Sequence, residues 1–170
     1  KVAIKILNEK FSQHESSITR FVREAKAASA LNHPNILVIH EIGEAENAHY
    51  IASENVEGKT LRQILRESHL KLSEILDISI QIANALAAAH KAFLVHRDIK
   101  PENIMIREDG FVKVLDFGLA KLIERKNKSI LGLNESTLSQ NDTAKGVILG
   151  TVNYMSPEQA KGERIDERTD

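Results

Sequence analysis

The segment His96-Arg97-Asp98-Ile99-Lys100-Pro101-Glu102-Asn103 carries more information about the fold than any other part of this sequence. It is polar and contains a proline, so we expect it to be a loop. Asp98, Lys100 and Asn103 bring a carboxylate, an ammonium group and an amide together within it. Asp98 or Asn103 alone could simply cap a turn, so the meaning of the segment depends on what surrounds it.

The residues after this loop are expected to form a β-hairpin. Ile104-Met105-Ile106 and Val112-Lys113-Val114-Leu115 are apolar runs, and Glu108-Asp109-Gly110 between them has the turn chemistry of a hairpin. Asp116-Phe117-Gly118 follows directly. From 121 to 145 the apolar pattern stops, and Ser, Thr, Asn, Lys and Gly take over. A loop of this length suggests function rather than simple connection.

The residues before the loop are expected to form a long helix and a short strand. The helix should start at Ser73, a good N-cap residue, and run to about Lys91, and Phe93-Leu94-Val95 should be the strand. The expected buried stripe of the helix, at helical spacings, consists of Ile75, Ile78, Ile82, Leu86 and Ala89.

The N-terminal third is expected to be mostly β-structure. Apolar runs predict strands over 2–7, 36–42 and 49–56. A helix is expected between Glu15 and Leu31, and a shorter one from Thr60 to Glu67. Strands come first and helices later, which is typical of two lobes in one chain.

Composition limits the possible functions. The 170 residues are 42% hydrophobic with a net charge of -1, so no overall field favours nucleic acid or an anionic membrane. There is no cysteine, which excludes disulfides and thiolate metal sites and fits a reducing compartment. We expect no apolar run to be long enough to cross a bilayer, and no signal peptide is visible. The sequence begins with Lys1, so we expect it to be internal to a longer protein.

Three segments are more specific in combination than singly: Val2-Ala3-Ile4-Lys5, the loop at 96–103, and Asp116-Phe117-Gly118. In this order, with Ser156-Pro157-Glu158 downstream, they resemble the motif set of protein kinases. The resemblance covers essentially the whole chain and implies an α+β, bilobal kinase fold. It also implies ATP and Mg²⁺ as cofactors, and protein serine or threonine hydroxyls as acceptors.

The resemblance assigns catalytic roles to four residues. Phosphoryl transfer needs an aligned nucleophile and positive charge on the phosphate oxygens, and little covalent help. Lys5 would bind the α- and β-phosphates and pair with Glu24 on the helix. Asp98 would orient the substrate hydroxyl and accept its proton, and Lys100 would steady the transferring phosphate. Lys5 or Glu24 taken alone could equally be an ordinary surface charge.

The resemblance also assigns the metal and nucleotide sites. Asn103 and Asp116 are oxygen donors suited to Mg²⁺. The adenine ring would lie between Ala3 and Met105, behind which Ser53 would be a small gatekeeper. Backbone groups of the hinge, at Glu54 and Val56, would bind the edge of the ring.

Serine/threonine specificity and regulation follow from further matching positions. Lys100 and Thr151, in Gly150-Thr151, are typical of Ser/Thr kinases, and the segment from 150 to 160 looks most like bacterial kinases of eukaryotic type. Arg97, beside the catalytic aspartate, is expected to bind a phosphate on the activation loop. Thr143 is the first candidate acceptor, followed by Ser139 and Thr137.

The resemblance places residues 1–53 in the small lobe, 54–58 in the hinge and 59–170 in the large lobe, with an activation segment at 116–158. The expected fold is truncated: the small lobe lacks its first two strands and the Gly-rich loop, and the large lobe lacks its later helices. Asp170 should bind the backbone of the catalytic loop. Glu158, which pairs with an arginine in the family, has no evident arginine partner here.

Other functions remain open at this stage. A pseudokinase or scaffold that only binds nucleotide, an inactive fragment of an active kinase, and a small-molecule kinase of related fold are the alternatives. The expected partners are ATP and Ser/Thr-containing proteins, with self-association for autophosphorylation, and no nucleic acid or membrane contact within this segment. The expected location is the cytoplasm, where the chain could belong to a membrane-anchored protein.

Overall fold

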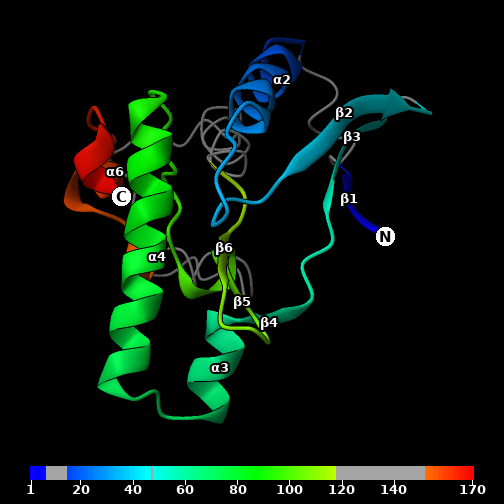
Figure 1. The fold of residues 1–170 in the computed structure, drawn as a ribbon. Helices are drawn as coiled ribbons and strands as arrows, with labels where there is room; N and C mark the ends of the chain where they lie inside the picture. Colours follow the sequence, from blue (N-terminus) through cyan, green and yellow to red (C-terminus); the bar gives the residue numbers. More distant parts are fainter. Residues whose placement is uncertain (7–14, 47, 118–151) are drawn as a thin grey trace, which may run out of the picture.

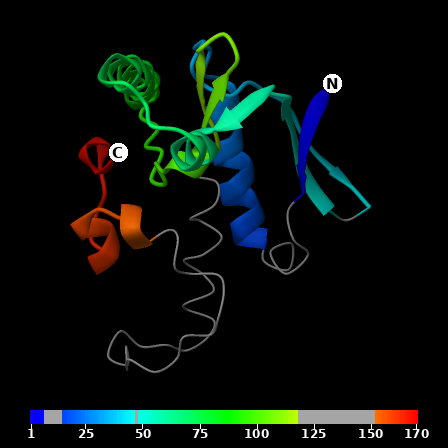
Figure 2. The same ribbon diagram turned by 90° about the horizontal axis from the view of Figure 1, so that it is seen from below.

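The computed structural model describes residues 1–6, 15–46, 48–117 and 152–170. Two small antiparallel sheets and the helices around them account for most of these residues. The first sheet and the C-terminal segment lie at opposite sides, and the second sheet lies between them (Figure 2).

The first sheet is built from β1 (Val2–Ile6), β2 (Ile39–Ala45) and β3 (Ala48–Glu54), in the order β1-β3-β2. Helix α2 (Glu15–Ser29) runs beside β2 (Figure 1). Ala25 of α2 and Ile51 of β3 are buried against each other, with Val22, Ile39 and Ile42 packed around them. Helix α2 thus covers the face of the sheet that carries Ile51.

The second sheet is built from β4 (Gly58–Thr60), β5 (Ile104–Arg107) and β6 (Val112–Val114), in the order β4-β5-β6. Helices α3 (Leu61–Glu67) and α4 (Leu72–Lys91) follow β4 along the chain. Ala85 and Ala89 of α4 pack with Val112 and Val114 of β6, and Ile36 joins them from the segment before β2. This cluster is the main core of the molecule.

The segment from Asn35 to Val38 connects the two sheets. Val114 N donates to Asn35 O at 2.8 Å, and Leu37 N donates to Val114 O at 3.0 Å. On its other side, Glu54 N donates to Val38 O at 2.9 Å. The end of β3 and strand β6 are therefore tied to one intervening segment, which limits how far the two sheets can move apart.

Helix α4 corrects the expectation that no apolar segment is long enough to cross a bilayer. Its 20 residues are long and apolar enough, by length and composition alone, to span a bilayer. Its Ala85 and Ala89 are fully buried in the core, as in the central helix of a globular domain. The same helix exposes Leu72, Leu76 and Ile80.

Several expected elements differ from the structure near α4. The N-cap is Lys71 instead of Ser73, because the Glu74 carboxylate accepts a hydrogen bond from Lys71 N at 2.7 Å. Ile75 is 45% exposed, so it does not belong to the buried stripe, whereas Ile78, Ile82 and Leu86 pack against the core. The expected strand at 93–95 is a turn, in which Phe93 has φ 58° and is 97% exposed.

Other expected elements are confirmed with small shifts. Strand β2 begins three residues later than expected, since Ile36 forms only a single parallel bridge with Val114. Thr60 caps α3, with its hydroxyl accepting from Gln63 N. The hairpin β5–β6 turns at Gly110, whose φ of 81° favours glycine.

Candidate active site

The loop that contains Asp98 is fixed by the side chain of Asp170. Asp170 is expected from the sequence to bind this loop, and its carboxylate accepts from His96 N at 2.6 Å and from Arg97 N at 2.7 Å. The Nε2 atom of His90, near the end of α4, lies 2.9 Å from the same carboxylate. The Asp170 side chain is only 1% exposed. Because Arg97 has φ 70°, this carboxylate holds a backbone conformation that most residues avoid.

Asp98 lies buried at the centre of the loop, with 6% of its surface exposed. Lys100 Nζ is 2.7 Å from Asp98 Oδ2, and Asn103 Nδ2 donates to the same oxygen at 2.9 Å. Asn103 Nδ2 also donates to the Asp98 carbonyl at 2.8 Å. The structure therefore brings together Asp98, Lys100 and Asn103, as the sequence predicts.

The ring of His96 supports this arrangement. Its ring packs against Phe117, with centroids 4.7 Å apart, and it is fully buried. Burial lowers the pKa of His96 from its ordinary 6.5, which keeps the imidazole neutral. Because Nδ1 accepts from Asp98 N at 3.2 Å, the ring proton belongs on Nε2, which donates to Leu115 O at 2.7 Å. His96 thus connects the Asp98 loop to the strand that leads to Asp116.

Lys5 and Asp116 face each other across the gap between the sheets. Lys5 Nζ lies 2.8 Å from Asp116 Oδ2, and the two side chains are 48% and 31% exposed. Both line a pocket whose other walls are Ala28, Leu37, Ile39, Ile51, Ser53 and Phe117. The expected partner of Lys5 was Glu24, whose side chain lies outside the described residues. In this structure the lysine is paired with Asp116.

The side-chain oxygens of Asn103 and Asp116 suit a magnesium ion that also binds phosphate. No group of three or more His, Cys, Asp and Glu side chains able to hold a metal occurs within the described ranges. Asn103 commits its Nδ2 to Asp98, so its amide oxygen is the atom left for a cation. Leu115 N donates to Asn103 O at 2.9 Å, which ties Asn103 to the residue before Asp116. Two protein oxygens completed by phosphate and water suit Mg²⁺.

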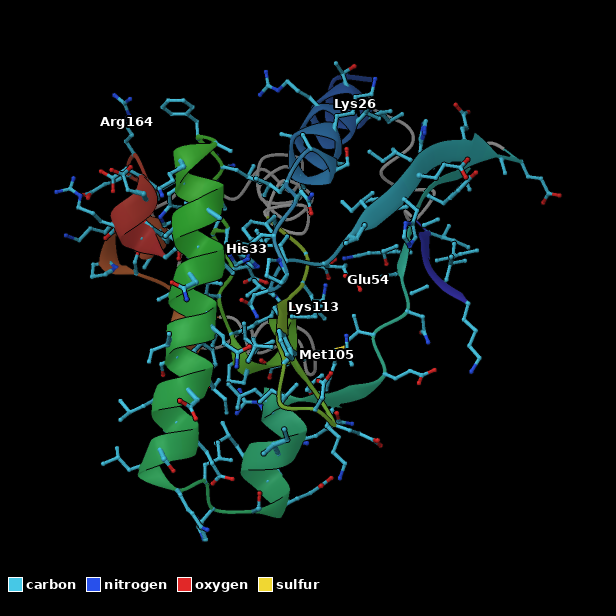
Figure 3. All side chains as sticks on the ribbon, in the orientation of Figure 1. Lys26, His33, Glu54, Met105, Lys113 and Arg164 are labelled. Carbon is cyan, nitrogen blue, oxygen red and sulfur yellow. The ribbon has the colours of Figure 1, made fainter. Side chains whose placement is uncertain are left out.

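The expected adenine site is only partly assembled in the structure. Ala3 lies opposite Ser53 in the register of β1 and β3, and Ser53 is 8% exposed at the wall of the pocket. Met105 is half-buried in β5 (Figure 3). The Glu54 carbonyl accepts from Ser53 Oγ at 3.3 Å, which leaves capacity for a second donor. Contacts of Ala3, Met105 and Val56 with a nucleotide stay a prediction.

An ion pair that nothing in the sequence indicates joins the end of β3 to β6. Lys113 Nζ on β6 is 2.7 Å from Glu54 Oε1, and it also donates to Ile36 O at 3.2 Å (Figure 3). Glu54 Oε1 accepts from Val38 N at 2.8 Å as well. The Lys113 side chain is 9% exposed and that of Glu54 is 26% exposed. The pair closes the junction between the end of β3, the segment 35–38 and β6.

Replacing Lys113 by methionine should lower the free energy of unfolding by about 2 kcal/mol, less than for a fully buried pair because Glu54 is partly exposed. Urea unfolding of the full-length protein measures this loss. The exposed pair Lys59–Glu67 supplies the control, and Lys59→Met should change stability by less than about 1 kcal/mol. If the two substitutions lowered the free energy of unfolding equally, the Lys113–Glu54 pair would contribute no more to stability than an exposed pair.

Helix α6 also holds the Asp98 loop in place. Gln159 Nε2, in α6 (Pro157–Lys161), donates to Arg97 O at 2.7 Å. Glu158, for which the sequence shows no evident arginine partner, accepts from Thr169 Oγ1 at 2.8 Å. Within the described residues, Glu158 thus has a hydroxyl as a partner. Thr143 and Thr151 lie outside those residues, as do the other expected phosphosites.

Comparison with known proteins agrees with this geometry. The chain matches the protein kinase domain family over residues 1–170. It is 42% identical over 171 residues to serine/threonine-protein kinase PrkC of Bacillus subtilis, covering 100% of this chain and 24% of that protein. It is 44% identical over 179 residues to serine/threonine-protein kinase pkn3 of Myxococcus xanthus, covering 99% of this chain and 30% of that protein.

The solved kinase domain of Mycobacterium tuberculosis PknI superposes with a TM-score of 0.72 at 29% identity, covering 99% of this chain and 58% of that chain. The expected α+β kinase fold is thus confirmed, while the boundaries of lobes, hinge and activation segment stay a prediction.

These matches define the class of the chain, which has the sequence and the fold of a protein kinase domain. The chain belongs to the protein kinase family. The curated relatives that it matches are bacterial serine/threonine kinases, and it spans about a quarter of their length.

Proposed function

We propose that the protein containing this chain transfers the γ-phosphate of ATP to serine or threonine hydroxyls of other proteins. The observation that carries the proposal is the buried Asp98 carboxylate, bound by Lys100 and Asn103 in a loop that Asp170 holds rigid. A carboxylate fixed in this way can orient a hydroxyl and accept its proton.

The other residues supply charge and position. Lys100 lies against Asp98, where its ammonium group would neutralise charge on the transferring phosphate. Lys5 lies at the pocket wall and would exchange its contact with Asp116 for the phosphates of ATP. Asn103 and Asp116 would hold Mg²⁺, which when bound shields the phosphate oxygens from one another. Glu24 remains the proposed partner that would keep Lys5 in place.

Regulation and location are part of the proposal. Arg97 is held by Asp170 and Gln159 through its backbone, beside the catalytic aspartate. Its guanidinium would bind a phosphate on Thr143 and so order the activation loop. Self-association would allow one copy to phosphorylate another. The need for ATP and the lack of cysteine support a cytoplasmic location.

A transfer assay with radiolabelled ATP on the full-length protein tests the function. Label should appear on serine and threonine of the protein itself or of an added protein acceptor, and phosphoamino-acid analysis identifies the acceptor residue. A protein that binds ATP with Mg²⁺ and transfers no label would be a nucleotide-binding scaffold, and this result would overturn the proposal. The presence of Lys5, Asp98, Asn103 and Asp116 together argues against that outcome, since a scaffold has no need of all four.

A further inference from the structure

Arg62 of α3 bridges two segments that flank the Asp98 loop. Its Nε donates to Glu102 Oε1 at 2.7 Å, and one terminal nitrogen donates to the Tyr154 hydroxyl at 2.8 Å. The guanidinium carbon also lies 5.6 Å from the centre of the Tyr154 ring. A planar guanidinium can make these contacts at once, which an ammonium group cannot do with the same geometry.

Both partners of Arg62 belong to segments that are tied to Asp98 or to its neighbour Arg97. Glu102 is the residue before Asn103 in the short helix η1 (Pro101–Asn103), and Asn103 binds Asp98 directly. Tyr154 ends the short helix η2 (Val152–Tyr154), shortly before α6, whose Gln159 binds the Asp98 loop. The nucleotide pocket, in contrast, is lined by residues of the first sheet, α2 and the Asp116 segment.

The ion pair changes the charge that an acceptor would meet. The Glu102 side chain is 44% exposed, so without a partner it would present a carboxylate to basic residues of an acceptor. The hydrogen bond from Arg62 is the main cause that lowers the pKa of Glu102. Lys100 and Asp98 form a second opposite-charge pair close by. The two pairs leave little net charge beside the acceptor hydroxyl.

We propose that Arg62 is a specificity-determining residue that makes the enzyme indifferent to basic residues next to the acceptor hydroxyl, because it neutralises Glu102 and holds Tyr154 in place. The favoured acceptors are then proteins with neutral or acidic residues around the serine or threonine. This inference rests on the proposed kinase function. Arg62 touches no reacting atom, so its influence should be seen in acceptor choice and in the KM for the acceptor.

A peptide panel measured with the full-length protein tests this role. One peptide that the wild-type enzyme phosphorylates is varied to arginine, alanine or glutamate at each of the flanking positions. For Arg62→Ala, kcat/KM for arginine-containing peptides should rise about three- to fivefold relative to the alanine peptides, as expected for a newly available exposed ion pair. The KM for ATP should stay unchanged, because Arg62 is remote from the nucleotide pocket.

Two further variants make the result decisive. Adding Glu102→Gln to Arg62→Ala should abolish the gain, since no carboxylate remains to attract arginine. Arg66→Ala, an exposed arginine near the end of the same helix, should leave the peptide preferences as in the wild type. An unchanged preference in Arg62→Ala, or a gain that persists in the double variant, would refute the role of Arg62. Neither result would touch the proposed function, because the enzyme would still transfer phosphate.

Discussion

Replacing Asp98 by asparagine should reduce kcat for phosphate transfer by about 10²- to 10⁴-fold, the usual contribution of a positioned general base. The asparagine keeps the size of the side chain and can still accept from Asn103, which donates to Asp98 Oδ2 at 2.9 Å. It loses the negative charge that would take the hydroxyl proton and that pairs with Lys100 at 2.7 Å. Proton acceptance should therefore fail while the loop stays in place.

The measurement is single-turnover transfer of labelled phosphate, combined with ATP binding followed by calorimetry. ATP affinity should change little, because Asp98 does not line the pocket that is proposed to bind the nucleotide. Asp109→Asn is the matched control, since Asp109 forms an exposed pair with Arg107 at 2.7 Å in the hairpin turn. Wild-type transfer by Asp98→Asn would rule out the catalytic role of Asp98.

Replacing Asp170 by alanine should lower the free energy of unfolding by roughly 3 kcal/mol, and should also slow catalysis at least about tenfold. The Asp170 carboxylate accepts from two backbone amides, at 2.6 and 2.7 Å, in a site where it is 1% exposed. Without it, the amides of His96 and Arg97 lose their acceptor inside the protein. The left-handed Arg97 backbone would relax, and Asp98 would move with it.

Thermal unfolding and kcat should be measured together on Asp170→Ala and on Asp166→Ala. Asp166 is the natural control, because it lies four residues earlier and its carboxylate accepts from the exposed side chain and the backbone N–H of Arg168. The two variants should differ clearly in both stability and kcat. If Asp170→Ala lost stability but kept full kcat below its unfolding temperature, Asp170 would be only a structural residue.

The local motifs of the sequence were enough to predict the centre of the site. Asp98, Lys100 and Asn103 lie within one short loop, so their proximity follows from chain connectivity, and the structure confirms it. The hairpin after the loop is also a local feature with known chemistry, and the structure confirms it. Asp170 was predicted through the family resemblance alone, since nothing local links it to residue 96.

The features that the sequence could not predict depend on contacts between distant residues. Lys113 and Glu54 are 59 residues apart, and Arg62 and Tyr154 are 92 apart, so no periodicity or spacing points to either contact. Charged residues on strands and helices usually face water. The sequence alone therefore indicated neither of these two contacts. The strand expected at 93–95 was wrong because an apolar run this short can equally form a turn, and the backbone N–H of Leu94 bonds back to Ala89 O.

The carboxylate of Asp170 also has a consequence for the order of folding. The contacts that give the Asp98 loop its shape join residues 74 and 73 positions apart. Contacts of such sequence separation form late, because a long stretch of chain must first be brought into place. On a ribosome, which releases the chain from its N-terminus onward, residues 96–98 emerge well before their anchor. The loop can therefore reach its final geometry only after Asp170 has been synthesised and has left the ribosome.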